Sequence, residues 1–246
     1  MTPILNISAY LFTPLADPPA WRDRVHGTAA GRGLKGTVLL APEGINLFLA
    51  GEPGPLRDFV AWLRRDVAFS SLRTKESWSR VRPFRKLLVK VKREIIRMNQ
   101  PTIRPADLRA PAVGPTTLAR WLDTGHDDMG RPVVMLDTRN AFEVAHGRFR
   151  GAIHWGLERF SEFPRALQEH RDTLRDKTVV TYCTGGIRCE KAALFMAGAG
   201  TEHVFQLDGG ILAYFEQAGG HHFEGDCFVF DQRETLDARL TETAAA

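Results

Sequence analysis

Residues 178–195 read TVVTYCTGGIRCEKAALF, a short apolar run followed by a glycine-bearing loop and a stretch of helical composition. This order predicts a buried strand over Thr178–Tyr182, a loop that starts at Cys183 and a helix over residues 189–199. Ligands of open α/β sheets bind beyond the carboxyl ends of the strands, which is where Cys183 lies. The segment therefore predicts an α/β domain with a functional loop at Cys183.

The loop has the composition expected around a reactive thiolate. Gly185 and Gly186 permit the backbone to curl so that successive N–H groups face the sulfur, and the following helix presents its positive end. Arg188 adds a full positive charge. Together these features predict a lowered pKa for Cys183 and a nucleophilic sulfur at neutral pH. The alternative is an inert buried cysteine, which is common in protein cores.

The other two cysteines have open or structural roles. Cys189 follows Cys183 at the start of the helix, where it either resolves an oxidised Cys183 through a disulfide or simply packs in the core. Cys227 lies close in sequence to His221 and His222. No metal site is predicted there, because no Cys-x-x-Cys pair is present and adjacent histidines are expected to point apart.

The remainder of the second half alternates between strands and helices. Val133–Asp137 is a second short apolar run, and residues 163–174 have helical composition. Such alternation favours a parallel sheet covered by helices on both faces.

The first half has a different order of elements. Apolar runs predict strands over residues 4–12, 36–41 and 45–50, and a fourth strand within residues 86–96. Helices are expected from Pro18 to the turn at residues 31–33 and over residues 54–66. The order strand, helix, strand, strand, helix, strand is typical of a ferredoxin-like α+β domain.

Charge and proline content place the boundary between the two halves. Residues 1–110 hold 19 Lys and Arg against 9 Asp and Glu, whereas residues 111–246 hold 14 against 20. Prolines recur between residues 101 and 115, which favours an extended connector. We therefore expect a basic ferredoxin-like domain over residues 1–100, a linker over 101–115, an α/β domain over 116–232 and a frayed tail over 233–246.

Composition excludes several classes of protein. The chain has 246 residues, of which 43% are hydrophobic and 25% charged, so it is neither disordered nor fibrous. No apolar run approaches the ~18 residues that a membrane helix requires. Three cysteines are too few for a disulfide framework, which favours a reducing, cytoplasmic environment. No flavin fingerprint is present, so no cofactor is predicted.

A basic stretch in the first half is a candidate for binding RNA. Ten Lys and Arg lie between residues 73 and 97, interleaved with Trp78 and Phe84. Basic side chains follow phosphates, and aromatic rings stack on unpaired bases. The predicted RNA-binding residues are Arg82, Arg85, Lys86, Lys90, Lys92, Arg93 and, in the turn between two strands, Asn46. The alternative is a solvated basic face with both aromatic rings in the core.

The loop resembles the active-site loop of rhodanese domains. Four residues separate Cys183 from Arg188, and the upstream segments DTR at residues 137–139 and GRFRGAI at residues 147–153 are also similar to rhodanese segments. The phosphatases that share this fold have a longer loop, so the resemblance favours sulfurtransferases and their relatives.

Three segments together resemble a narrower family. YCTGGIRCEKA at residues 182–192, APEGIN at residues 41–46 and FEGDCFVFD at residues 223–231 are similar to the TrhO family of rhodanese-like tRNA uridine hydroxylases. The resemblance implies an acylphosphatase-like N-terminal domain followed by a rhodanese domain. It also implies formation of 5-hydroxyuridine at the wobble position 34 of tRNA, with molecular oxygen as co-substrate and Cys183 as the essential cysteine.

The chemistry gives the other site residues expected roles. A thiolate that adds to C6 of uracil makes C5 an electron-rich enolate carbon, and a transient persulfide on the same sulfur is the alternative. Arg188 or Arg139 is expected to stabilise the enolate oxygen, with Asp137 and Cys189 in supporting positions. The loop residues expected to surround the sulfur are Thr184, Gly185, Gly186, Ile187 and Arg188.

Two other functions remain open on the sequence alone. A persulfide sulfurtransferase with a small donor such as thiosulfate needs the same loop, and an RNA-binding module needs no reactive thiol. Apart from tRNA, the sequence predicts no stable protein partner and no membrane.

Overall fold

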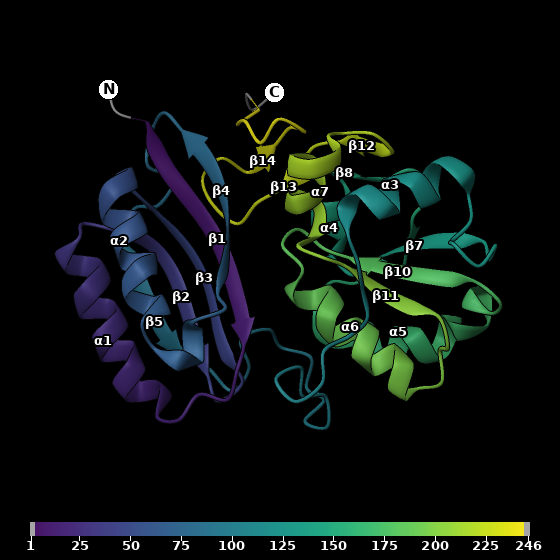
Figure 1. Ribbon diagram of the computed structural model, residues 1–246, viewed down its shortest axis with the longest axis horizontal. Coiled ribbons are helices and arrows are strands. Elements are labelled where there is room, and N and C mark those ends of the chain that lie inside the picture. Colours follow the sequence, from purple (N-terminus) through teal and green to yellow (C-terminus); the bar gives the residue numbers. More distant parts are fainter. Residues whose placement is uncertain (1–2, 244–246) are drawn as a thin grey trace. The chain divides into compact units, whose positions relative to one another are not determined.

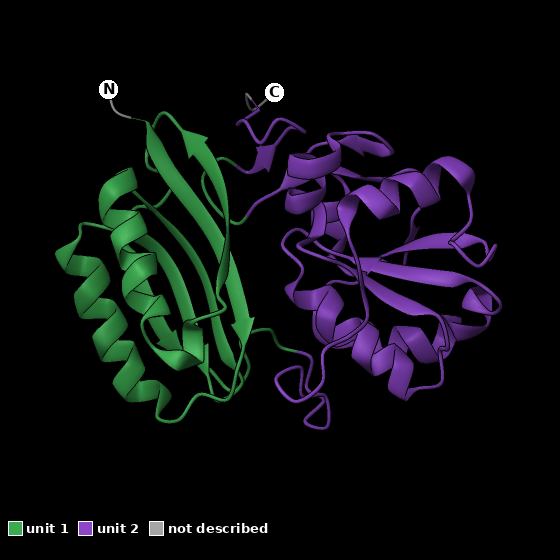
Figure 2. Ribbon diagram, viewed as in Figure 1, with its two compact units in different colours: residues 1–97, 230–233 green, residues 98–229, 234–246 purple. Residues whose placement is uncertain are grey.

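The computed structural model describes residues 3–243, which form two compact units (Figure 2). Residues 1–97 and 230–233 make up unit 1, and residues 98–229 and 234–246 make up unit 2. Each unit has its own sheet and its own hydrophobic core. Among the described helices, none combines the length and apolar character needed to cross a bilayer.

Unit 1 is a five-stranded sheet with two helices on one face (Figure 1). Its elements are β1 (Ile4–Phe12), α1 (Pro18–Gly31), β2 (Lys35–Ala41), β3 (Gly44–Gly51), α2 (Pro53–Arg64), β4 (Arg73–Ser79) and β5 (Leu87–Val91), with a 3-10 turn at Val67–Phe69. The strand order is β4-β1-β3-β2-β5, and all neighbours are antiparallel except β2 and β5. The first four strands have the ferredoxin-like order predicted from the sequence.

The core of unit 1 follows from the spacing of apolar residues along its strands and helices. Leu5, Ile7 and Leu11 alternate along β1 and pack with the helical face that carries Phe59 and Leu63 of α2. Each such side chain contributes about 1.5–3 kcal/mol by leaving water. Because alternate residues share one face of a strand and every third or fourth residue shares one face of a helix, this packing was predictable.

The fourth strand differs from the prediction. The sequence predicts it within residues 86–96, but the strand in that position of the fold is β4, Arg73–Ser79. β4 lies at the edge of the sheet and is polar, so it has no apolar alternation to reveal it. Leu87–Val91 instead forms β5, an additional strand at the opposite edge that runs parallel to β2.

Unit 2 is built around a parallel sheet with helices on both faces (Figure 1). The sheet has the order β6-β11-β10-β7-β9, formed by Ala112–Val113, Val204–Leu207, Thr178–Tyr182, Val133–Asp137 and Ile153–His154. All of its pairs are parallel, as predicted. Its helices are α3 (Pro115–Thr124), α4 (Ala141–Val144), α5 (Phe163–His170), α6 (Ile187–Gly198) and α7 (Gly210–Ala218).

Two small antiparallel pairs complete unit 2. β8 (Gly147–Phe149) pairs with β12 (Phe223–Gly225), and β13 (Cys227–Phe228) pairs with β14 (Thr235–Leu236). Short 3-10 turns lie at Phe160–Glu162 and Arg171–Leu174. Part of the expected frayed tail therefore forms a strand, and Glu242 makes a further bridge to Leu236. Residues 244–246 lie outside the described part of the chain.

The expected linker over residues 101–115 also contributes to unit 2. Residues 112–113 form the edge strand β6, and the Arg109 guanidinium donates to both carboxylate oxygens of the buried Glu190 at 2.9 and 3.1 Å. Residues 230–233, expected in the α/β domain, cluster instead with unit 1, where Arg233 donates to Ser77 at 2.8 Å. Long-range contacts of this kind leave no local signal in the sequence.

Candidate active site

Cys183 lies directly after β10, in the loop that leads into α6, as the sequence predicted. Gly186 precedes the helix with φ +105°, a left-handed conformation that favours glycine. The turn aims backbone N–H groups at the sulfur. The N–H of Gly186 donates to Cys183 Sγ at 3.2 Å, and the N–H groups of Arg188 and Cys189 also hydrogen-bond to it.

The surroundings of Cys183 favour the thiolate. Burial by itself raises the pKa of this thiol, because Cys183 is only 1% exposed. The hydrogen bond with Cys189, the charge of Arg188 and the backbone N–H groups outweigh burial and hold the pKa of Cys183 well below its usual range. These groups favour the thiolate form of the sulfur, in a conformation that closes it off from solvent.

Cys189 has the opposite character. Burial and the neighbouring Cys183 raise the pKa of the Cys189 thiol well above its usual range. Its single S–H lies between two acceptors, the Cys183 sulfur and the carbonyl oxygen of Gly186 at 2.9 Å. The two cysteines form a coupled pair in which Cys183 carries the negative charge and Cys189 keeps its proton.

Arg188 is held in place by a residue that sequence reasoning missed. Its Nη1 and Nη2 donate to the two carboxylate oxygens of Glu143 at 2.5 and 2.7 Å, and both side chains are buried. Glu143 lies in α4, which brings it to Arg188 across 45 positions of sequence. The available signal was the place of Glu143 between the rhodanese-like segments at residues 137–139 and 147–153, but no spacing rule linked it to the loop.

Arg139 and Asp137 form a separate buried pair. The Arg139 guanidinium donates to Asp137 at 2.9 and 2.6 Å and to the carbonyl oxygen of Gly147 at 2.6 Å. Arg139 is 0% exposed, and its hydrogen bonds join the end of β7 to the start of β8. This indicates a structural role. Of the two arginines predicted to act on the substrate, Arg188 is therefore the better placed, because its charge acts on Cys183.

The start of α7 supports the back of the loop. The N–H groups of Ile211 and Leu212 donate to the carbonyl oxygens of Cys183 and Thr184 at 3.0 and 3.1 Å. Gly210 approaches so closely that an added Cβ would lie 2.4 Å from the Cys183 carbonyl oxygen. The helix and the loop are therefore fitted to each other at this position.

The remaining loop residues take structural positions. The Thr184 hydroxyl donates to the carbonyl oxygen of Phe228 at 3.2 Å, Gly185 is half-buried, and Ile187 is buried at the start of α6. Thr138 fixes the end of β10, because its hydroxyl donates to the Tyr182 carbonyl oxygen at 2.8 Å.

The predicted RNA-binding side chains lie on unit 1, in and around β5. Six of them are exposed: Arg82, Arg85, Lys86, Lys90, Lys92 and Arg93. Trp78 is 42% exposed, whereas Phe84 is half-buried, so the two aromatic rings are not both in the core. Lys90 and Lys92 lie at or just beyond the edge strand of the sheet.

Asn46 differs from the other predicted RNA contacts because it is buried. Its side-chain amide donates to the carbonyl oxygen of Ile95 at 3.3 Å, and the Ile95 N–H donates to the Glu43 carboxylate at 2.7 Å. The APEGIN segment thus anchors the chain that follows β5. This contact gives Asn46 a structural role and argues against its direct contact with RNA.

Two further features of unit 2 lie away from the loop. Burial raises the pKa of Cys227 to about 12, and this cysteine does not join the histidines. Instead His221 and His222 both contact Asp123, contrary to the expectation that adjacent histidines point apart.

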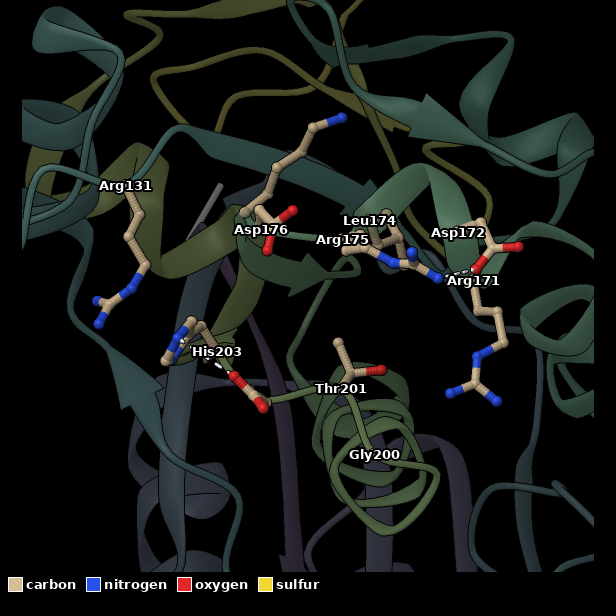
Figure 3. Close-up of a pocket in the computed structure, with 11 residues that line it drawn as sticks. Arg131, Arg171, Asp172, Leu174, Arg175, Asp176, Gly200, Thr201 and His203 are labelled. Carbon is tan, nitrogen blue, oxygen red and sulfur yellow. Dashed lines mark hydrogen bonds and ion pairs between the residues drawn. The ribbon is translucent and has the colours of Figure 1, made fainter.

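A cavity of about 490 Å³ lies at the opposite end of the sheet from Cys183 (Figure 3). Lys177 and His203, which line it, directly precede β10 and β11, whereas Cys183 follows β10. Its arginines alternate with acidic residues, and Arg175 pairs with Asp172 at 2.9 Å. The cavity therefore does not contribute to the thiolate site.

Comparisons with known proteins identify both domains and full-length relatives. Residues 4–95 match the model of the UPF0176 acylphosphatase-like domain, and residues 115–217 match that of the rhodanese-like domain. A relative from Bordetella petrii named tRNA uridine(34) hydroxylase is 60% identical over 100% of this chain and 97% of its own length. One of the same name from Variovorax paradoxus is 59% identical over 100% of this chain and 93% of its own. The chain belongs to the family of these tRNA uridine(34) hydroxylases.

Similarity to solved structures is weaker. A rhodanese-like domain from Anabaena sp. is 23% identical, with a TM-score of 0.38, over 47% of this chain and 79% of that one. The resemblances to rhodanese and to the hydroxylase family that the sequence motifs indicated are confirmed by the family models and by the full-length relatives.

Substituting Gly210 tests the fit between α7 and the loop. In Gly210→Ala the new Cβ collides with the Cys183 carbonyl oxygen, so we expect the loop to shift and the pKa of Cys183 to rise. Ultraviolet absorbance of the thiolate against pH measures this. Gly125→Ala is the control, because Gly125 has a left-handed φ of +78° but no atom within 4 Å of an added Cβ. Positive φ costs both variants about 1–2 kcal/mol, so equal pKa changes would exclude the collision as the cause.

Removing the charge of Arg188 tests its effect on the sulfur. Arg188→Met alone leaves Glu143 buried and unpaired, at a cost of about 3–5 kcal/mol, so Glu143→Gln is combined with it. We expect the double variant to have a raised Cys183 pKa, so that alkylation by iodoacetamide begins to fail at a higher pH than in the parent protein.

The matched control for this variant is Arg150→Met with Glu224→Gln, which removes an exposed ion pair of the same unit. Its alkylation profile should follow the parent profile. An unchanged profile in the Glu143 and Arg188 double variant would show that Cys189 and the N–H groups hold the thiolate without the charge of Arg188.

Proposed function

We propose that this protein is a tRNA uridine(34) hydroxylase, an oxidoreductase that forms 5-hydroxyuridine at the wobble position with molecular oxygen. The observation that carries the proposal is the Cys183 thiolate, held by N–H groups in a chain related over its full length to proteins of that name. A tRNA-modifying enzyme works where tRNA is found, so we expect the protein in the cytoplasm.

The thiolate supplies what uracil lacks, which is electron density at C5. The Cys183 sulfur forms a bond to C6, and the C5–C6 π electrons move into an enolate that extends over C5, C4 and the C4 oxygen. Arg188 stabilises the developing negative charge, because its guanidinium lies beside the sulfur and stays charged at any accessible pH.

Oxidation at C5 and departure of the sulfur complete the reaction. One atom of molecular oxygen bonds to C5, and the other leaves as water after taking two electrons and two protons from an external donor. Removal of the C5 proton then expels the Cys183 thiolate and restores the C5–C6 double bond. The lowered pKa of Cys183 favours this last step, because a stabilised thiolate is a good leaving group.

Access to the sulfur requires movement. Cys183 is 1% exposed, so a uracil ring does not reach it in the closed conformation. The target base also has to leave its stack in the anticodon loop, where bases are already unpaired and cheap to extrude. Binding energy from the tRNA backbone is available to offset both costs.

The exposed basic side chains of unit 1 are the proposed source of that binding energy. Lys90, Lys92 and Arg93 are exposed around β5, and Trp78 offers a partly exposed ring for stacking. Unit 2 cannot supply the attraction by itself, because acidic residues outnumber basic ones over residues 111–246.

The persulfide sulfurtransferase is the second function that the loop allows. The names of the full-length relatives do not favour it. Thiocyanate release from thiosulfate and cyanide, at a rate comparable with tRNA hydroxylation, would be the result in its favour.

Removing the sulfur separates these functions from simple RNA binding. We expect Cys183→Ala to lower formation of 5-hydroxyuridine by about 10⁴-fold or more, as for other enzyme nucleophiles, while tRNA affinity stays the same. Mass spectrometry of nucleosides from treated tRNA measures the product, and filter binding measures affinity. Cys227→Ala is the control, because Cys227 is an equally buried thiol that keeps its proton. Full activity of Cys183→Ala would contradict the proposal.

Removing two lysines tests the proposed RNA-binding face. We expect Lys90→Ala with Lys92→Ala to weaken tRNA binding and to reduce the slope of log affinity against log salt by about 1 for each phosphate that the protein no longer neutralises. The control is Arg22→Ala with Arg65→Ala, which removes the same charge from helix α1 and from the C-cap of α2. Equal weakening in both double variants would indicate a general charge effect instead of a defined surface.

A further inference from the structure

Asp123, His221 and His222 bring three metal-binding atoms together on unit 2. Nε2 of His221 lies 3.0 Å, and Nε2 of His222 lies 2.8 Å, from the same Oδ1 atom of Asp123. All three atoms lie within 4.8 Å of one another. Asp123 is near the end of α3, and the histidines follow α7, which packs beside α3 on the same face of the sheet (Figure 1).

The distances match those between neighbouring ligands of one metal ion. Bonds of about 2.0–2.1 Å from a metal ion to nitrogen or oxygen place adjacent ligand atoms about 2.9 Å apart in octahedral geometry and about 3.3 Å apart in tetrahedral geometry. The two observed separations of 3.0 and 2.8 Å are close to these values. A metal ion can take the place of the protons that join the two Nε2 atoms to Asp123. This exchange requires only small movements of the three side chains.

The backbone of both histidines is held in place. The Tyr214 hydroxyl donates to the carbonyl oxygen of His221 at 2.8 Å, and the Arg150 N–H donates to that of His222 at 2.8 Å. Tyr214 is itself 0% exposed and belongs to the core of unit 2. Two rings on a fixed backbone lose less entropy on binding an ion than two rings on a mobile loop.

We propose that Asp123, His221 and His222 bind one divalent transition-metal ion, with Zn²⁺ as the best fit. Two imidazoles and one carboxylate suit Zn²⁺ and its neighbours in the first transition series, whereas Mg²⁺ and Ca²⁺ prefer oxygen ligands alone. Water completes the coordination, since the side chains of Asp123 and His221 are 55% and 66% exposed.

The ion acts as a clamp between the end of α3 and the chain that follows α7. The first turn of α7 supports the Cys183 loop through Ile211 and Leu212, whereas the histidines follow its last turn. The nine residues of the helix span about 13 Å, so the ion does not touch a base bound at Cys183. The clamp instead fixes the position of the helix on which the loop rests.

Calorimetric titration of the full chain with ZnCl₂, after treatment with EDTA, tests the site. We expect one saturable equivalent of Zn²⁺ and a rise in melting temperature that grows with zinc concentration. His221→Ala, His222→Ala and Asp123→Asn should each weaken binding by at least about tenfold, because a site with three protein ligands is left with two. His26→Ala, which removes an exposed histidine of unit 1, should bind like the parent protein.

The thiols are the competing zinc ligands, so Cys183→Ala is titrated in parallel. Binding that Cys183→Ala removes and the three ligand variants retain would overturn the proposal, as would the absence of saturable binding. Because these titrations contain no tRNA, failure of the proposed hydroxylase function would leave their outcome unchanged.

Discussion

A negative charge kept out of water is the constraint on which unit 2 depends. Cys183 is 1% exposed, and burial opposes the thiolate. The N–H groups around the sulfur and the charge of Arg188 replace the water that a thiolate would otherwise bind. Gly186 is required for the turn that aims those N–H groups, since its φ of +105° is unfavourable for residues with a side chain.

The buried charges of Arg188 and Glu190 in α6 each need a partner from another segment of the chain. Arg188 is balanced by Glu143, which α4 brings to the loop from a distant part of the sequence. Glu190, in the same helix as Arg188, is balanced by Arg109 from the segment before the sheet. Because removal of one partner leaves a buried charge unpaired, at about 3–5 kcal/mol, the loop depends on residues that never approach the substrate.

How far the sequence predicted this structure depends on the range of the interactions. The strand, loop and helix around Cys183 follow from an apolar run and two glycines within a few residues, and they were predicted. Strand β4 was missed because an edge strand with charged side chains has no apolar period. Glu143 and the contact of Asp123 with the histidines were missed because each joins residues far apart in the chain. Asn46 was predicted to contact RNA from its place in the turn between two strands, whereas its amide bonds to the backbone of Ile95.

The groups that make Cys183 reactive also bury its sulfur in a closed loop. Amides and Arg188 replace water around Cys183 only while the loop is closed, and an open loop lets water compete for the thiolate. A protein that stabilises its nucleophile in this way needs a substrate large enough to offset the cost of opening. The proposed tRNA substrate has a long polyanionic backbone, and unit 1 carries 10 Lys and Arg between residues 73 and 97. A small sulfur donor has no comparable surface, so coupling of opening to binding is better suited to a macromolecular substrate than to thiosulfate.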